Sequence, residues 1–181
     1  PLMFVVEQLP ILYNEEFEYE NGWSIGSEDD ANSGVWVRGV PNPTYIGDNL
    51  IQTDTDHTLE GEECYITGNT YMPFDPGLDD IDDGVTTLIS PIYDLTDYDN
   101  VLLKYWLWYT NNLGENPYED YWQVDISNDN GLNWINLENL NASSTNWQLH
   151  RIILSEFIEM TDEVILRFKA SDLNNPSLVE A

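Results

Sequence analysis

Closely spaced carboxylates are the side chains whose types and spacing could do chemistry in this sequence. Asp54-Thr55-Asp56 offers alternate carboxylates on one side of an extended loop, and residues 75–84 hold five Asp residues in ten positions. Calcium takes about six to eight oxygen ligands, so such clusters indicate calcium. Residues 75–84 lack the spacing and the terminal Glu of an EF-hand. Two interpretations therefore stay open for them: a calcium site built from Asp79, Asp80 and Asp82, or a flexible acidic loop.

A third polar segment, residues 111–120, follows a run of aromatic residues. Exposed aromatic rings stack on sugars and nearby amides hydrogen-bond to them, so a glycan-binding surface could use Trp108, Asn111, Asn112 and Tyr118. The alternative is that these rings belong to the core, as most aromatic rings of a β-sandwich do.

Catalytic residue types are sparse. His57 and His150 are the only histidines and Cys64 is the only cysteine, so the sequence offers no zinc-binding set. Carboxylate pairs are numerous, but among 34 Asp and Glu residues some pair always has a suitable spacing. We therefore predict that the protein is not an enzyme. We expect Cys64 to be buried as a small apolar side chain.

The net charge limits the classes of partner. Five Lys and Arg residues stand against 34 Asp and Glu residues, which gives a formal charge of -29. This excludes the basic surface of a nucleic-acid binder and disfavours docking on anionic membranes. Such self-repulsion weakens a compact state unless cations neutralise it, and we expect calcium to do so. The alternative is a solvated acidic surface. No apolar run reaches the ~18 residues of a membrane span, so no membrane insertion is predicted.

The elements that must position these residues are short strands. Residues 101–109 are apolar on nearly both faces, which predicts a central strand, whereas residues 122–126 and 164–170 alternate and predict one buried face. Further strands are expected at residues 86–90 and 147–154. No segment carries a sustained helical stripe, and residues 155–160 could form one helical turn at most. At 181 residues the chain is predicted to be one all-β sandwich.

A turn signal lies between two of the expected strands. The segment Ser127-Asn128-Asp129-Asn130-Gly131-Leu132-Asn133-Trp134 has Asn-Gly at its centre, which is typical of a tight hairpin. The segment resembles the Asp-box, a hairpin of many secreted β proteins in which Asp accepts backbone N–H groups. We give it a structural role and no catalytic one.

Several short motifs occur in an order that is known from one family. They are, in chain order, Glu16-Phe17-Glu18, Gly22-Trp23, Trp36-Val37-Arg38, Asp56-His57-Thr58 with Gly61, residues 87–91, residues 103–109, and residues 164–168. This order resembles the MAM domain, a jelly-roll β-sandwich of extracellular receptors and proteases, and above all MAM-like modules of secreted bacterial proteins. The expected fold is therefore an all-β, jelly-roll-like antiparallel β-sandwich.

The resemblance also implies a cation site and a division of the chain. It points to Glu18 and Asp56 as calcium ligands, with Asp54 and the oxygens of Thr58 nearby. Residues 15–181 would be the MAM-like sandwich, without the closing strand and its acidic pair that such domains usually have. Residues 1–14 would be an additional apolar strand segment or the remnant of a preceding domain. The disulfide cysteines of the family are absent, as in its bacterial branch.

Two hypotheses about function follow. The first is a non-catalytic extracellular protein, secreted or on the cell surface, that is stabilised by calcium and adheres or self-assembles. An apolar N-terminal strand could be shared with a neighbouring subunit and build a filament, so the partner would be the chain itself or another extracellular protein. The alternative is an accessory module of a larger secreted hydrolase that binds a glycan or a protein.

Overall fold

The structure is a computed structural model, and it describes residues 10–70, 75, 77–173 and 177–181. These residues form twelve strands and one short 3-10 helix, η1 (Leu154–Glu156). The strands are β1 (Ser24–Ile25), β2 (Trp36–Gly39), β3 (Thr44–Ile46), β4 (Asn49–Gln52), β5 (Cys64–Thr67), β6 (Gly84–Ile89), β7 (Leu102–Gly114), β8 (Trp122–Ser127), β9 (Ile135–Leu140), β10 (Ser144–Ile153), β11 (Ile165–Asp172) and β12 (Ser177–Glu180).

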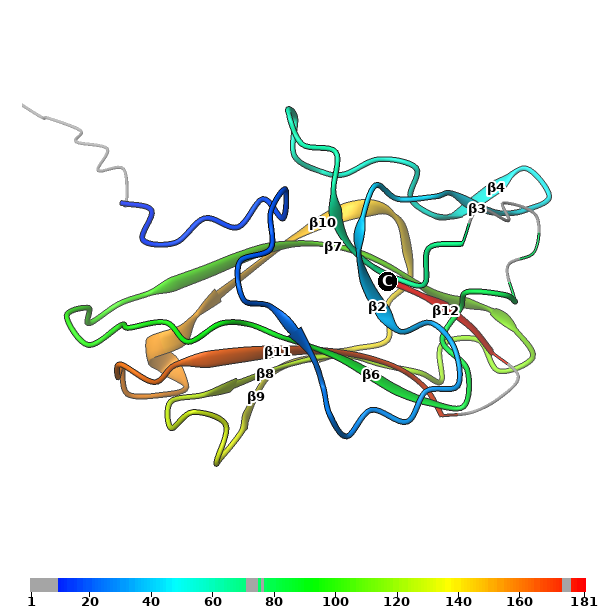
Figure 1. The fold of residues 1–181 in the computed structure, drawn as a ribbon. Coiled ribbons are helices and arrows are strands. Elements are labelled where there is room, and N and C mark those ends of the chain that lie inside the picture. The colour runs from blue at the N-terminus through cyan, green and yellow to red at the C-terminus, as the bar shows by residue number, and fades with distance from the viewer. Residues whose placement is uncertain (1–9, 71–74, 76, 174–176) are drawn as a thin grey trace, which may run out of the picture.

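Two antiparallel sheets form the two layers of the molecule (Figure 1). One sheet has the strand order β1-β6-β11-β8-β9 and the other has the order β10-β7-β12, with the short pairs β2–β5 and β3–β4 beside them. From β6 the chain crosses to the other sheet at β7, returns at β8, and crosses again at β10, β11 and β12. This arrangement confirms the predicted all-β, jelly-roll-like antiparallel β-sandwich.

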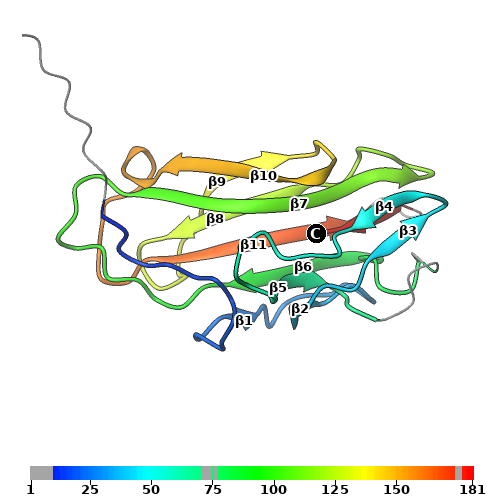
Figure 2. The ribbon, with the colours of Figure 1, turned by 90° about the horizontal axis from the view of Figure 1, so that it is seen from above.

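The hydrophobic core lies between the two layers, which Figure 2 shows from above. The buried side chains that meet there include Trp122, Val124, Ile126, Leu166 and Phe168 of the five-stranded sheet and Leu107, Tyr109 and Val179 of the other. The Trp122 ring joins the layers, because its centroid lies 6.0 Å from that of Phe168 and 6.1 Å from that of Tyr109. The alternation predicted for β8 and β11 therefore places their apolar faces in this core.

One polar residue of β8 is buried although it lies on the outer face of the sheet. Asp125 points away from the core, yet it is only 2% exposed. Arg167 Nε lies 2.7 Å and Lys169 Nζ 3.1 Å from its carboxylate, and the amides of Gln123 and Asn136 donate to it at 2.8 and 2.9 Å. Burial alone would raise the pKa of Asp125, but these hydrogen bonds outweigh burial and lower it.

The hairpin between β8 and β9 has the expected construction. Ser127 Oγ donates to the Asp129 carboxylate at 2.7 Å, and the backbone N–H of Asn133 donates to the same oxygen at 2.8 Å. Asn130 and Gly131 both have positive φ, 55° and 83°, as tight hairpin turns require. Asp129 therefore has the structural role predicted for an Asp-box-like segment, because it holds the turn through these hydrogen bonds.

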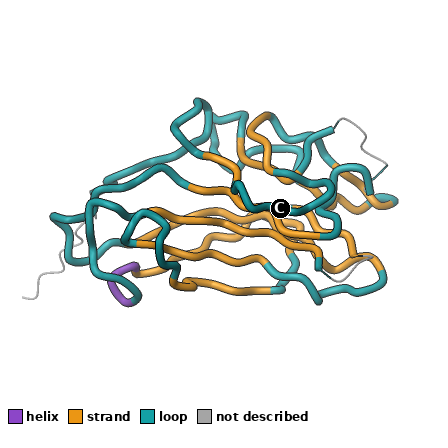
Figure 3. Tube along the Cα trace, turned by 60° about the horizontal axis from the view of Figure 1, so that its bottom comes forward, coloured by secondary structure: helices purple, strands orange, loops and turns teal. Residues whose placement is uncertain are grey.

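Among the described residues, helical structure is restricted to η1, which Figure 3 shows at the end of the β10 strand. η1 begins one residue before the segment 155–160, in which the sequence allowed one helical turn, and ends at Glu156. In the described part of the chain, no helix has the length and apolar character needed to cross a membrane.

Both described ends of the chain pack on the sandwich. The Tyr13 ring lies 4.7 Å from the Tyr93 ring, and the carbonyl oxygen of Ala181 accepts the Thr67 N–H at 2.9 Å. Residues 1–9, which include the apolar segment on which the strand-sharing hypothesis depends, lie outside the described residues.

The Asp125 network predicts a pH-dependent contribution to stability. We expect Asp125→Asn to lower the free energy of unfolding by about 2 kcal/mol at pH 7, because Arg167 and Lys169 lose their charged partner but stay partly solvated. The folded-state pKa is lowered, so this contribution is complete above the unfolded-state pKa of about 3.9 and is lost as the pH falls through the folded-state pKa.

Urea unfolding followed by tryptophan fluorescence between pH 7 and pH 2 measures this contribution. The difference between wild type and Asp125→Asn should shrink below a pH of about 4. Asp97→Asn, at an exposed position, is the control and should change little. A difference that stays constant down to pH 2 would contradict the assignment.

Candidate functional site

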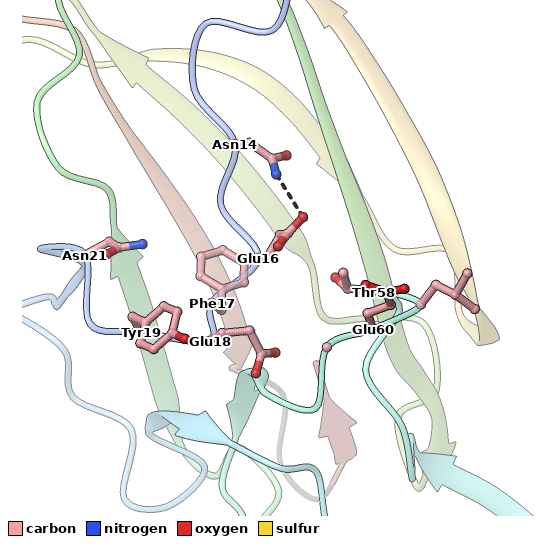
Figure 4. A pocket seen from close by; sticks show the side chains of 10 residues that line it. Asn14, Glu16, Phe17, Glu18, Tyr19, Asn21, Thr58 and Glu60 are labelled. Atoms are coloured by element: carbon pink, nitrogen blue, oxygen red, sulfur yellow. Dashed lines mark hydrogen bonds between the residues drawn. The ribbon is translucent and has the colours of Figure 1, made fainter.

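Two carboxylates from distant segments approach one point beside Gly61. A Cβ atom built on Gly61 would lie 2.6 Å from Asp56 Oδ2 and 2.8 Å from Glu18 Oε1. Figure 4 shows the Glu18 side chain directed from the N-terminal segment toward the loop that carries Thr58 and Glu60. The structure therefore brings together Glu18 and Asp56, the two residues that the MAM-like resemblance indicated, and the absence of a side chain at Gly61 leaves the space between them.

Backbone hydrogen bonds hold both carboxylates in place. Asp56 accepts the N–H groups of His57 at 2.6 Å and Thr58 at 2.9 Å, so it organises its own turn. Glu18 Oε1 accepts the N–H groups of Glu62 and Glu63 at 2.8 and 3.0 Å. These bonds fix one oxygen of Glu18 and both oxygens of Asp56. Because Glu18 Oε1 already accepts two N–H groups, a cation would be bound by the other Glu18 oxygen and by the second lone pair of each Asp56 oxygen.

Aromatic side chains of the three-stranded sheet pack against the loop that carries Asp56. The His57 ring stacks on Trp106 of β7, with centroids 3.7 Å apart and an interplanar angle of 20°. Trp147 of β10 meets the same histidine edge-on at 6.1 Å. This explains the position of His57 within the motif: its ring anchors the Asp56 turn to the three-stranded sheet. Sequence reasoning missed Trp106, which is 43% exposed, because the run around it is apolar on both faces.

The residues around Gly61 offer oxygen atoms, which are the ligands that calcium prefers, but they supply fewer ligands than the about six to eight that calcium takes. An open pocket of about 650 Å³ lies beside them, and Glu16, Glu60 and Thr58 are among its lining residues. Across the described ranges, no group of three or more His, Cys, Asp or Glu side chains is placed to hold a metal ion. A calcium ion here would use Glu18, Asp56 and Thr58, and it would need water and backbone carbonyls for its remaining ligands.

The site carries a negative field. Burial, and after it the charges of Asp56 and Glu18, raise the pKa of the Cys64 thiol to about 12. Cys64 is buried, as predicted. Asp54 is exposed, and the hydrogen bonds of the turn run through Asp56 instead. The carboxylates of Asp54 and Asp56 therefore differ in environment, although their spacing suggested a clamp.

The three predicted ligands of the second acidic segment, Asp79, Asp80 and Asp82, differ in hydrogen-bond partners and in burial. Asp79 accepts hydrogen bonds from the backbone and hydroxyl of Thr70, and Asp82 accepts one from Ser33 Oγ at 3.1 Å. Asp80 is buried. The three carboxylates thus face different partners, and the structure separates Asp80 from the two that lie nearer the surface.

The predicted glycan-binding residues are split between core and surface. Trp108 is buried and donates its indole N–H to the Ile51 carbonyl at 2.6 Å, and Asn111 is buried as well. Asn112 and Tyr118 are exposed. The reason is that β7 extends to Gly114, so neither residue lies in a surface loop. Asn111 is on the side of β7 that also carries the core residue Tyr109, whereas Trp108 is on the opposite side, where its hydrogen bond to Ile51 joins it to β4.

The histidines have structural surroundings. His150 Nδ1 lies 2.9 Å from Glu138 Oε1, and its ring stacks on Tyr105 with centroids 4.9 Å apart. One pattern typical of serine hydrolases does occur in the chain, Gly22-Trp23-Ser24-Ile25-Gly26, and sequence reasoning overlooked it. The structure places Ser24 in β1, paired with Ile89 of β6, and not at the strand-to-helix turn that a nucleophile elbow requires.

The cradle at Gly61 yields a direct test of calcium binding. We expect Gly61→Ala to lose the calcium-dependent rise in melting temperature, because its Cβ would occupy the space between Asp56 and Glu18. Calorimetric melting with calcium and with chelator measures the rise. Gly77→Ala is the matched control, since an added Cβ at Gly77 meets no described atom within 4 Å. A full calcium response in Gly61→Ala would rule out this site.

Comparison with known proteins assigns the chain to no family. No family model matches the chain, and no curated protein matches it in sequence. The β-sandwich itself does not select a function, because one such fold carries many unrelated activities. The order of motifs that resembles the MAM domain thus stays a prediction.

Proposed function

We propose that the protein is a calcium-stabilised, non-catalytic extracellular interaction module of MAM-like type. The observation that carries the proposal is the convergence of Glu18 and Asp56 on the open space at Gly61. A site with two carboxylates is weakly charged, and extracellular calcium modules of this kind bind at about 10⁻⁴–10⁻³ M. Such a site is filled where calcium is plentiful, which favours a secreted or cell-surface location.

The charge balance supports dependence on a cation. The formal charge of -29 opposes compaction, and divalent cations at carboxylate clusters offset this repulsion. At Gly61 the repulsion is local, because two carboxylates approach the same point. Calcium there would join the N-terminal segment that carries Glu18 to the loop that carries Asp56.

The surroundings of the reactive residue types support a non-catalytic role. The thiol of Cys64 is buried and its pKa is raised to about 12 by burial and by Asp56 and Glu18, so it is not a thiolate nucleophile at neutral pH. His57 stacks on Trp106, and His150 is engaged by Glu138 and Tyr105. Each of these side chains is accounted for by packing or by a structural hydrogen bond.

Self-assembly by strand addition is the form of interaction that we favour, with a second copy of the chain as partner. The long strand β10 is an outer strand of its sheet and pairs with β7 on one side. Outer strands present backbone N–H and C=O groups to a further strand. The alternative is an accessory module of a secreted hydrolase, and the exposed ring of Trp106 beside His57 favours a glycan as its ligand.

Light scattering with calcium and then with excess chelator tests the proposal. We expect assemblies in calcium that dissociate on chelation, because the cation holds the fold that presents the outer strands. Deleting residues 1–9 should leave a folded monomer and abolish the assemblies. Assemblies that survive the deletion would contradict strand sharing. A monomer in both conditions, with a lower melting temperature in chelator, would favour the accessory module.

A further inference from the structure

The two long strands of the three-stranded sheet carry no acidic side chain. β7 and β10 contain neither Asp nor Glu, although 34 of the 181 residues are acidic. They do contain two of the five basic residues, Lys104 and Arg151. Charge is therefore distributed unevenly over this chain, and an anionic ligand that approaches these strands meets no carboxylate on them.

The strand register places the two basic residues side by side (Figure 2). Lys104 of β7 is directly opposite Arg151 of β10, and Trp106 is directly opposite Leu149. Side chains two residues apart on a strand share a face, so these four lie on the same face. Leu107 of β7 is in the core, which puts the four residues on the outer face of the sheet. We call this set of four side chains the β7–β10 face.

The basic pair of the β7–β10 face has no electrostatic partner within the part of the chain that the structure describes. Lys104 and Arg151 are exposed and form no ion pair there, whereas Arg38, Arg167 and Lys169 each contact a carboxylate. Like charges directly opposite each other on neighbouring strands are destabilising. A bound anion would offset this repulsion.

An exposed aromatic ring lies next to the basic pair. Trp106 is 43% exposed although His57 stacks on its ring with centroids 3.7 Å apart. Trp147 meets the His57 ring edge-on and helps to hold it. A ring that is fixed before binding loses little conformational entropy when a ligand packs on it. Trp106 is therefore a preformed stacking surface.

The spacing of these groups suits a sugar with a charged substituent. Residues two apart on a strand are separated by about 7 Å, and neighbouring strands by about 4.8 Å. A sugar ring that packs its C–H groups on Trp106 therefore brings a carboxylate or sulfate within reach of the long side chains of Lys104 and Arg151. The guanidinium of Arg151 can bind such a group through two parallel hydrogen bonds.

The overall negative charge does not prevent this contact. At physiological ionic strength, exposed charges more than about 8 Å apart are largely screened, so a short saccharide responds mainly to the nearest side chains. An acidic protein segment would also satisfy the basic pair. Its carboxylate side chains, however, would leave the exposed ring of Trp106 without an apolar contact, so the face fits a saccharide better.

We propose that the β7–β10 face binds an anionic saccharide, with a sugar ring on Trp106 and a carboxylate or sulfate held by Lys104 and Arg151. The proposal rests on the accessory-module alternative and names its ligand class. It needs neither calcium at Gly61 nor strand addition, because the ligand lies on the face of the sheet and not along the outer edge of β10.

Isothermal titration calorimetry with three oligosaccharides of equal length tests the proposal. Hyaluronan fragments carry carboxylates, keratan sulfate fragments carry sulfates, and chitin fragments are neutral. We expect at least one charged fragment to bind about tenfold tighter than the neutral one, and to bind less tightly as the salt concentration rises. The fragment that binds distinguishes a carboxylated ligand from a sulfated one. Equal affinity for all three fragments, or binding of neither charged fragment, would overturn the proposal.

Two charge-removing variants test the basic pair. Lys104→Gln and Arg151→Gln should each weaken binding of the charged fragment by about tenfold and leave the affinity for the neutral fragment unchanged. Ser27→Asp is the matched control, because it changes the net charge by the same amount at an exposed position between β1 and β2. An equal loss of affinity in Ser27→Asp would assign the effect to net charge and contradict the proposal.

Two further measurements test the saccharide itself. Trp106→Ala should weaken binding of charged and neutral fragments alike, and Trp106→Phe should restore part of it, because a phenyl ring also packs on a sugar. Full affinity in Trp106→Ala would exclude stacking on this ring. A glutamate peptide with the same number of charges should bind more weakly than the charged fragment. Equal affinity for the peptide would assign the face to an acidic protein segment instead.

The variants also separate this proposal from the calcium proposal. Neither Lys104 nor Arg151 belongs to the Glu18–Asp56 site, so both Gln variants should retain the calcium-dependent rise in melting temperature of the wild type. A rise that persists while saccharide binding is lost supports the β7–β10 face. Absence of saccharide binding in a wild type that still responds to calcium would overturn the saccharide proposal alone.

Discussion

The balance of carboxylate charge is the constraint on which the rest of the structure depends. With five basic residues against 34 acidic ones, cationic side chains can balance few carboxylates. Backbone N–H groups stabilise many of the other carboxylates. The Asp29 carboxylate accepts the N–H of Thr87 at 2.7 Å, and the Asp30 carboxylate accepts the N–H of Val85 at 2.9 Å. Hydrogen bonds to charged groups are stronger than those between neutral ones, so each such contact also fixes the local backbone.

This use of carboxylates gives the loops their shape. Asp29 and Asp30 tie the segment between β1 and β2 to β6, next to the outer strand β1. Asp56 and Glu18 do the same for the loop before β5. An acidic sequence that could have remained an extended, self-repelling chain therefore forms ordered loops, because its carboxylates serve as acceptors for otherwise unpaired N–H groups.

Sequence reasoning predicted the sheets and only part of the candidate sites. Apolar periodicity places β7, β8 and β11 correctly, because burial of one strand face is a local property. Glu18 and Asp56 could be paired through the order of motifs. Lys104 and Arg151 could not, since they lie side by side only through the register of β7 and β10. The burial of Trp108 and Asn111 was likewise invisible, because the length of β7 depends on its partners β10 and β12.

The candidate cation site at Gly61 and the buried carboxylates affect the fold in different ways. The surface site at Gly61 joins two loops, so its occupancy changes local order. The buried carboxylates lie inside the sandwich, where a charge without a partner would oppose the packing of the sheets. Asp125 shows that the chain can bury a carboxylate when cationic side chains stand beside it. Asp120, which is 1% exposed, instead accepts the Leu173 N–H at 2.8 Å, so main-chain N–H groups hold a carboxylate in the interior in the same way as they hold carboxylates in the loops.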